Sequence, residues 1–285
     1  MNSWNQIYTH FDPVAFYLFG IGIHWYGIMY ALALGTALMV GKWLIKRDNI
    51  AIDKEAIGDF FLWVEIGVIL GARLWYVLFY DTHTAYYLSH PWQIFNPFMD
   101  GQFVGIRGMS YHGALVGFLV AAFLFTRRRK QPFFVYMDLV ALSVPLGYVF
   151  GRIGNFLNQE LVGKETTVSW GIYVYDTVTL RHPSQLYEAF LEGVVVFVIL
   201  MAVRHRVKIA GILTFMYGIL YALARFVAEF WREPDVQLGY LYGDWLSMGQ
   251  LQSLIMMAIA LAGLVYAYRR GEPRATAIGR GRSRS

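Results

Sequence analysis

Long apolar runs separated by short polar stretches make up most of this chain. Seven of the runs approach the about 20 residues that an α-helix needs to cross the hydrocarbon core of a bilayer. We expect transmembrane helices at about residues 14–41, 57–80, 108–126, 134–156, 184–203, 210–231 and 247–268. The pattern predicts an all-α membrane protein with about seven transmembrane helices, which together form one domain over residues 1–268.

The composition supports a membrane protein and limits its chemistry. Hydrophobic residues make up 57% of the chain and charged residues 15%, whereas about a quarter of the residues in a typical soluble domain are charged. The chain has no cysteine, so it has no disulfide, no thiolate metal ligand and no cysteine nucleophile. Any thiol that takes part in its chemistry must come from another molecule.

Basic residues are distributed unevenly among the polar stretches between the predicted helices. Seventeen of the 24 Lys and Arg residues lie in alternate stretches, at residues 42–55, 127–130, 204–208 and 269–285, and four lie on the other side. The positive-inside rule then places the N-terminus outside and the C-terminus in the cytoplasm. The last stretch, residues 269–285, is basic and poor in apolar residues, so we expect a disordered cytoplasmic tail.

Two of the loops predicted to lie outside have a character of their own. Residues 81–107 mix aromatic and polar residues, which is typical of a segment lying along the membrane interface. Within the second loop, residues 157–183, the segment 166–180 is rich in β-branched and aromatic residues. We therefore expect an interfacial arm in the first loop and a small extracytoplasmic β element in the second.

Three arginines lie inside the predicted helices, where a charged group is costly. Arg73, Arg152 and Arg225 cannot lose their charge, and a guanidinium at the centre of a transmembrane helix costs about 2.5–3.5 kcal/mol on insertion scales. The predicted topology places all three in the outer half of the membrane. This placement favours a phospholipid headgroup as the ligand, because a transporter or channel for anions would distribute such charges through the full membrane depth.

The segment GYVFGRIGNFLNQELVG, residues 147–163, carries the strongest local signal. Its glycines are typical of close helix packing. Packing does not explain the polar residues at the outer end of the segment. Arg152 and Asn155 are three residues apart, so they share one helix face and could hold one phosphate or carboxylate together.

The sixth predicted helix repeats this pattern. Tyr221, Arg225 and Glu229 follow one another at spacings of four residues and therefore lie on one stripe of the helix. Glu229 could neutralise Arg225 in an ion pair, and it could also orient the guanidinium toward a ligand. For Arg73, the nearest acidic residue on the same helix is Glu65, about two turns away, so structural pairing and ligand binding both stay open.

Two histidines are candidates for a chemical role. His112 lies in GMSYHG near the outer start of the third predicted helix, where it could be a structural residue or a catalytic one. His24 lies about ten residues into the first predicted helix, nearer the middle of the membrane, and could belong to an aromatic packing cluster. The sequence has no HExxH motif, nucleophile elbow or phosphate-binding loop, which leaves metal hydrolase, serine hydrolase and nucleotide-driven activities without support.

At these residues the chain resembles the bacterial prolipoprotein diacylglyceryl transferase family. The string GRIGNFLNQELVG is similar to the signature of that family. Five further blocks are also similar, and all six stand in the same order as in the family. The five are HWYG at 24–27, GMSYHG at 108–113, RHPSQLYE at 181–188, REPD at 232–235 and SMGQ at 247–250. Together the blocks extend over most of the chain apart from the tail.

The resemblance implies an activity and its partners. Members of the family are seven-helix proteins of the bacterial inner membrane that move the sn-1,2-diacylglyceryl group of phosphatidylglycerol to the lipobox cysteine in the signal peptide of a preprolipoprotein. This transfer is the first step of bacterial lipoprotein maturation. The resemblance implies an active site in the extracytoplasmic half of the membrane, with the lipid bilayer as a partner and without nucleic acid, metal or other cofactor.

The resemblance also assigns roles to residues. His112 corresponds to the family's essential histidine, Arg152 and Asn155 to its signature arginine and asparagine, and Arg225 to its second essential arginine. The implied catalytic residues are His112, Arg152 and Arg225. The implied substrate-binding residues are Arg152, Asn155, Tyr26, Glu160, Gly163, Tyr221 and Glu229. The chain departs from the signature at Gln159, where glycine is usual, which bears on how the substrate peptide docks.

The implied reaction agrees with the charges inside the predicted helices. A thiolate attacks the sn-3 carbon of the lipid's glycerol, the carbon–oxygen bond breaks, and glycerol 1-phosphate leaves. The leaving phosphate gains negative charge, so Arg152 and Arg225 would stabilise the transition state more than the ground state. A free cysteine thiol, with a pKa of about 8.5, is only a few per cent ionised at neutral pH, and His112 is the candidate base.

Overall fold

The computed structural model describes residues 3–52, 54–99, 101–103, 105–174, 177–234, 239–243 and 245–274. The chain divides into two compact units, one formed by Met1–Ala51 with Met137–Ser285 (unit 1) and the other by Ile52–Tyr136 (unit 2). The prediction of a disordered tail falls mainly on residues 275–285, which lie outside the described residues. The first two residues of the predicted tail, Arg269 and Arg270, are helical instead, because the last helix of unit 1 ends at Arg270.

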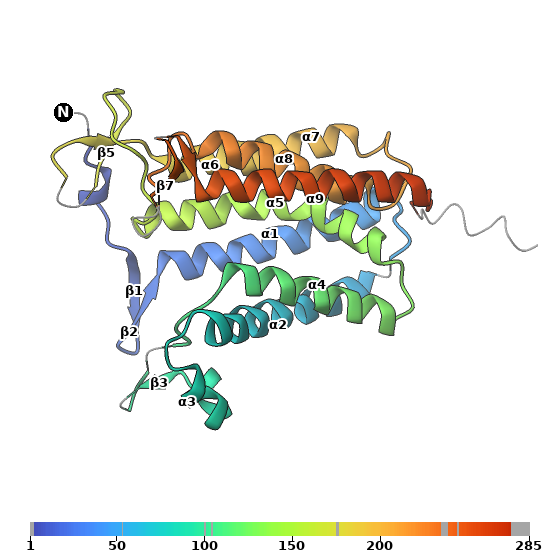
Figure 1. Ribbon diagram of the computed structural model, residues 1–285, viewed down its shortest axis with the longest axis horizontal. Coiled ribbons are helices and arrows are strands. Elements are labelled where there is room, and N and C mark those ends of the chain that lie inside the picture. The colour runs from blue at the N-terminus through green and yellow to red at the C-terminus, as the bar shows by residue number, and fades with distance from the viewer. Residues whose placement is uncertain are drawn as a thin grey trace, which may run out of the picture. The chain divides into compact units, whose positions relative to one another are not determined.

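Unit 1 is built from helices whose axes run in roughly the same direction (Figure 1). They are α1 (Trp25–Arg47), α5 (Phe133–Leu157, which starts in unit 2), α6 (Ser184–Glu188), the π-helical segment η3 (Ala189–Val195), α7 (Val196–Val203), α8 (Ile212–Ala228) and α9 (Met248–Arg270). The segments α6, η3 and α7 follow one another without a break and form one helical span of 20 residues.

Unit 2 consists of two long helices and an arm. Helices α2 (Lys54–Phe79) and α4 (Tyr111–Arg128) lie side by side (Figure 1). The chain between them forms α3 (Thr84–Ser89), the 3-10 helix η2 (Pro91–Phe95) and an antiparallel strand pair, β3 (Phe98–Met99) and β4 (Gln102–Phe103). The predicted arm at 81–107 is therefore a folded segment, and its aromatic residues Tyr86, Trp92 and Phe98 are exposed.

The helical content agrees with the hydropathy pattern. Within the described part of the chain, five helices are long and apolar enough to cross a membrane: α1, the Glu55–Phe79 part of α2, α5, the continuous span from α6 to α7, and α9. Helix α8, with 17 residues, is apolar but shorter. The chain is thus mostly helical with several possible membrane spans, as expected, and the count of seven stays a prediction.

The first apolar run differs from the prediction. Residues 14–24 form a β-hairpin of β1 (Val14–Leu18) and β2 (Ile21–His24), and α1 begins only at Trp25. Phe19 and Gly20 form the turn with positive φ angles of 50° and 81°, which is the geometry that tight hairpin turns require. The expectation that His24 lies about ten residues into the first helix is wrong, since His24 precedes the first residue of α1.

The small β elements of unit 1 gather at one end of its helices. The hairpin β1–β2, the pair β5 (Ile172–Tyr173) and β6 (Leu180–Arg181), and the pair β7 (Tyr240–Tyr242) and β8 (Leu246–Ser247) all lie there (Figure 1). The pair β5–β6 confirms the β element expected in 166–180. Buried Tyr8, Phe156 and Ile172 form a hydrophobic cluster that joins β5 to the end of α5.

Glycines allow α2 and α4 to pack closely. A methyl group added at Gly71 would collide with the backbone oxygen of Gly113, and one added at Gly117 would collide with the backbone oxygen of Gly67. Small residues four positions apart let the backbones of membrane helices approach each other. The close contact within unit 2 therefore depends on these four glycines.

The Gly117→Ala variant is expected to unfold at a lower temperature than the wild type. The added methyl group would force α2 and α4 apart, at a cost of about 1–3 kcal/mol. Thermal unfolding in detergent, followed by circular dichroism, measures the change. Gly58→Ala is the matched control, because Gly58 lies on α2 with open space around its Cβ position. Equal unfolding temperatures for the two variants would show that the helices do not depend on this contact.

Candidate active site

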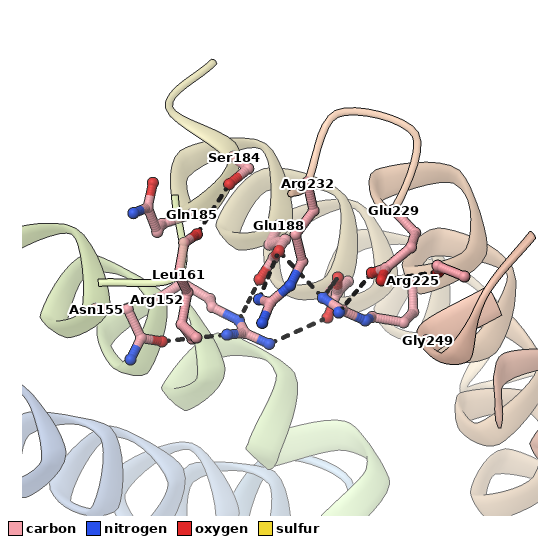
Figure 2. Close-up of polar contacts among 12 residues, drawn as sticks. Arg152, Asn155, Leu161, Ser184, Gln185, Glu188, Arg225, Glu229, Arg232 and Gly249 are labelled. Atoms are coloured by element: carbon pink, nitrogen blue, oxygen red, sulfur yellow. Dashed lines mark hydrogen bonds and ion pairs between the residues drawn. The ribbon is translucent and has the colours of Figure 1, made fainter. Parts of the chain in front are cut away.

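A cluster of charged side chains lies at the end of unit 1 that carries the small β elements (Figure 2). Three arginines and three glutamates take part, and they come from α5, from the α6–α7 span, and from α8 and the turn after it. The members are Arg152, Glu188, Glu192, Arg225, Glu229 and Arg232. Buried ionisable groups are costly unless they pair, so these six side chains depend on one another.

Helical spacing brings the members of the cluster to a common side. Glu188 and Glu192 are four residues apart on the continuous α6–α7 span, as are Arg225 and Glu229 at the end of α8. Glu192 lies in η3, where the backbone widens into a π-helix. Such π-helical turns inside α-helices are frequent at functional sites.

Arg152 is held from several sides. Its Nε lies 2.9 Å from Oε2 of Glu188 and donates a hydrogen bond of 2.6 Å to the Tyr148 hydroxyl. Its Nη1 donates to Oδ1 of Asn155 at 3.1 Å, and its Nη2 lies 4.0 Å from Oε2 of Glu192. The Tyr148 hydroxyl in turn donates to Glu192. This arrangement leaves the guanidinium of Arg152 little freedom to rotate.

Arg225 shares the same two carboxylates. Its Nη1 lies 3.1 Å from Oε1 of Glu188 and 3.6 Å from Oε1 of Glu192, and its Nη2 lies 2.6 Å from Oε2 of Glu229. Arg232 adds a third guanidinium, whose Nη1 donates to Oε1 of Glu188 at 3.3 Å. Glu188 therefore joins all three arginines.

Two further contacts extend the cluster outward. The Nδ2 of Asn155 donates to Oε1 of Glu160 at 2.7 Å, so the asparagine links Arg152 to a fourth carboxylate. On the other side, the Ser247 hydroxyl donates to Oε1 of Glu229 at 3.0 Å. A methyl group added at Gly249 would collide with the Glu229 carboxyl group, so that carboxyl group would have to move.

The exposed part of the cluster is cationic. The side chains of Arg152 and Arg225 are 15% and 14% exposed, whereas those of Glu188 and Glu192 are 0% exposed. The side chains of Arg152 and Arg225 are therefore more accessible to an approaching anion than the carboxylates of Glu188 and Glu192. Within the described residues, no group of three or more His, Asp or Glu side chains is arranged to hold a metal ion.

Comparison with known proteins identifies the family. The family model for prolipoprotein diacylglyceryl transferase matches residues 13–266. This chain belongs to the prolipoprotein diacylglyceryl transferase family. It is 64% identical over 254 residues to the phosphatidylglycerol–prolipoprotein diacylglyceryl transferase of Wolinella succinogenes, covering 89% of this chain and 92% of the relative.

Other members of the prolipoprotein diacylglyceryl transferase family are similar over the same length. The proteins of that name from Campylobacter lari and Aliarcobacter butzleri are 60% and 58% identical over 262 and 261 residues. Each alignment covers 92% of this chain and 95% of the relative. The matched range of the family model, residues 13–266, includes parts of both units and the positions of the cluster.

Several residues that the family resemblance implies lie at this cluster. Arg152, Asn155 and Glu160 form one chain of hydrogen bonds. Arg225 and Glu229 form an ion pair, which is one of the two roles that the sequence suggested for Glu229. The ring of Tyr221 contacts that of Tyr148, with centroids 5.7 Å apart. These six residues therefore belong to a single network in unit 1.

Tyr26 and Gly163 lie at the border of the network. Tyr26, in the first turn of α1, lies against Gly154. A methyl group added at Gly154 would be 3.3 Å from the Tyr26 ring. Gly163 donates its backbone N–H to the His182 carbonyl at 3.2 Å, and an added methyl group would collide with that carbonyl. The absence of a side chain at Gly163 is therefore required by backbone packing.

His112 belongs to unit 2. It lies in the first turn of α4, is exposed, and its ring contacts that of Tyr111 at a centroid distance of 6.0 Å. Ser110 caps this helix by accepting a hydrogen bond from the Gly113 N–H at 3.3 Å. The backbone N–H of Ser110 donates to the Ala72 carbonyl at 3.0 Å. The backbone before His112 is thus tied to α2, which holds the histidine in place within its unit.

Arg73 has a structural role in unit 2. Its Nε donates to the Ile94 carbonyl at 2.5 Å, and its Nη1 donates to the carbonyls of Arg107 and Gly108. Its guanidinium also lies 5.2 Å from the centroid of the Tyr87 ring. Arg73 therefore connects α2 to the middle of the arm and to its C-terminal end. Its partners are backbone carbonyls and an aromatic ring, whereas the sequence suggested Glu65.

Glu188 and Glu192 are two members of the cluster for which the sequence predicted no role. Glu188 is the last residue of the block RHPSQLYE, and Glu192 follows it one helical turn later inside an apolar run. Two acidic residues at helical spacing in a predicted membrane helix carry the same cost as the arginines. That signal could have identified them as the missing partners.

Proposed function

We propose that this chain transfers the sn-1,2-diacylglyceryl group of phosphatidylglycerol to the cysteine thiol of a prolipoprotein. The proposal rests on its membership of the family over residues 13–266 and on relatives named for this activity at 58–64% identity. The structural observation that supports it most is the buried network. In this network Arg152 and Arg225 share Glu188, and the two arginine side chains are partly exposed while Glu188 is not. A phosphodiester headgroup fits such a surface.

The proposed arrangement in the membrane has seven transmembrane helices in one catalytic domain, residues 1–268. It adds α4 and α8 to the five longer spans, with the N-terminus outside the bacterial inner membrane and a basic cytoplasmic tail from residue 269. The loops 81–107 and 157–183 then lie outside. The concentration of Lys and Arg in the alternate loops supports this orientation.

In the proposed mechanism, the arginines bind the phosphate of phosphatidylglycerol. The thiolate of the lipobox cysteine attacks the sn-3 carbon, a carbon–sulfur bond forms, the carbon–oxygen bond breaks, and glycerol 1-phosphate leaves. Charge on the phosphate increases during this step, so Arg152 and Arg225 stabilise the transition state more than the ground state. Glu188 and Glu192 hold the guanidinium planes, which removes the need for reorganisation during the reaction.

His112 is the proposed base that takes the proton of the thiol. Asn155, Glu160, Tyr26, Gly163, Tyr221 and Glu229 complete the proposed substrate-binding set. The reaction needs no metal, nucleic acid or other cofactor, because the phosphate is a fair leaving group once its charge is stabilised. The active site then faces the extracytoplasmic half of the bilayer, where the signal peptide of the preprolipoprotein presents its cysteine.

A reconstituted assay tests the function. Purified protein incubated with phosphatidylglycerol and a lipobox peptide is expected to produce a peptide whose mass increases by one diacylglyceryl group on cysteine. A peptide with serine in place of cysteine is the matched control and should stay unmodified. If no adduct forms under conditions in which a relative from the family is active, the assignment is wrong.

A further inference from the structure

A polar pocket in unit 1 is lined by the segment after α1, the loop between α7 and α8, and the segment after α9. These segments lie at the end of the helices of unit 1 opposite the small β elements (Figure 1). The pocket has a volume of about 80 Å³. That is several times the about 10–15 Å³ that one water molecule needs. The ionisable side chains that line it are Asp48, Arg204, His205, Lys208 and Arg274. None of them belongs to the proposed active site.

Backbone hydrogen bonds build the wall of this pocket. The Ala210 N–H donates to the Glu272 carbonyl at 2.9 Å, and the Arg274 N–H donates to the Lys208 carbonyl at 2.7 Å. The Nη1 of Arg274 donates to the Arg204 carbonyl at 3.0 Å. The segment after α9 is thus paired with the loop before α8, and the guanidinium of Arg274 is held in position.

The pocket has an excess of positive charge. Arg204, Lys208 and Arg274 face a single lining carboxylate, Asp48, which pairs with Nε of Arg204 at 3.0 Å. The imidazole Nε2 of His205 lies 4.0 Å from the same carboxylate. With His205 neutral, the lining side chains carry two more positive than negative charges.

One donor and one acceptor on the lining side chains are left without a hydrogen-bond partner. Nη2 of Arg274 and Oδ1 of Asp48 are both buried, and neither has a hydrogen-bond partner among the described residues. Burial lowers the pKa of this guanidinium, while the nearby carboxylates of Asp138 and Asp48 oppose that shift. Asp138 is already satisfied, because it accepts hydrogen bonds from Gly211 and Thr214 at the start of α8. A buried cationic donor without a partner is costly, and an anion would satisfy it.

We propose that this pocket binds a phosphate group, carried either by an anionic phospholipid or by a free phosphate compound. A phosphate oxygen accepts from Nη2 of Arg274, and the Lys208 ammonium adds a second charge-assisted contact. Two of the basic stretches of unit 1, the loop 204–208 and the segment after α9 that carries Arg274, lie at this end. In the proposed topology this is the cytoplasmic surface, where headgroups of the inner leaflet carry negative charge.

Two charge-reversal variants of the full-length protein test the proposal. Lys208→Glu changes a side chain that lines the pocket, whereas Arg206→Glu changes an exposed side chain in the same loop that does not line it. Native mass spectrometry measures the binding of dioctanoyl phosphatidic acid. Thermal unfolding with added inorganic phosphate measures the binding of the free ion. Lys208→Glu is expected to weaken binding about ten-fold or more, because a carboxylate then faces the phosphate at close range.

The controls separate the two sources of phosphate. Arg206→Glu should bind within about two-fold of the wild type. A loss confined to phosphatidic acid identifies a lipid headgroup, and a loss with inorganic phosphate as well identifies a site for free phosphate. Arg274→Gln should reproduce the loss seen in Lys208→Glu, with diacylglyceryl transfer unchanged in both. Equal binding by Lys208→Glu and Arg206→Glu, or no binding by the wild type, overturns the proposal.

Discussion

Replacement of Arg152 by alanine is expected to lower kcat/KM for diacylglyceryl transfer by about 10²–10³-fold, since loss of one preorganised donor to a developing charge has that effect. The variant loses the guanidinium proposed to hold the phosphate of phosphatidylglycerol. It also leaves Glu188 with two of its three arginines and Asn155 without its donor. Product formation from the lipobox peptide, followed by mass spectrometry, measures the loss, and binding of phosphatidylglycerol should weaken in parallel.

Arg152→Lys is the variant that separates chemistry from folding. Breaking a buried ion pair costs about 3–5 kcal/mol, so Arg152→Ala also lowers the stability of unit 1. Lysine keeps a positive charge beside Glu188 but lacks the planar fork that contacts a phosphate at two points. We expect Arg152→Lys to unfold near the wild-type temperature and still to lose most of its transfer activity. Near-normal turnover in Arg152→Lys would show that Arg152 serves only to pair the glutamates.

Replacement of His112 by glutamine is expected to lower transfer by about 10²–10⁴-fold at neutral pH, the range typical of a lost general base. Binding of phosphatidylglycerol should stay near the wild-type level, because the arginine cluster is unchanged. The loss should become smaller as the pH rises toward about 8.5, where a free thiol ionises without a base. Initial rates between pH 6.5 and about 9 measure this dependence.

The matched control for this variant is His83→Gln. His83 also lies in unit 2, and its side chain is 78% exposed with Asp81 as its partner. Its replacement should leave the rate and the pH profile unchanged. If His112→Gln instead lowered the rate by the same factor at every pH, His112 would be a positioning residue and the thiol would lose its proton elsewhere.

Much of the helical layout follows from local sequence. The boundaries of α2, α5 and the α6–α7 span lie within a few residues of the apolar runs that predict them. The exception is the first run, because apolar, β-branched and aromatic residues suit a hairpin as well as a helix. Phe19 and Gly20, which form the turn, decide between the two.

The sequence also identified part of the polar network. Arg152 with Asn155, and Arg225 with Glu229, are neighbours on their own helices, so their spacing alone predicted that they lie together. The link between the two pairs is Glu188, which lies on a third helix. Spacing along one helix carries no information about which residue of another helix faces it.

By itself, the sequence determined that this is a mostly helical chain with several spans, that its basic residues alternate between loops, and that three arginines lie where charge is costly. Each of these features depends on residues close together in the chain. The tertiary structure decided the partners of those arginines. Arg152 and Arg225 share Glu188 and Glu192, whereas Arg73 binds backbone carbonyls of the arm. The difference arises because burial of a charge demands compensation, and only the packing of distant segments determines which groups can provide it.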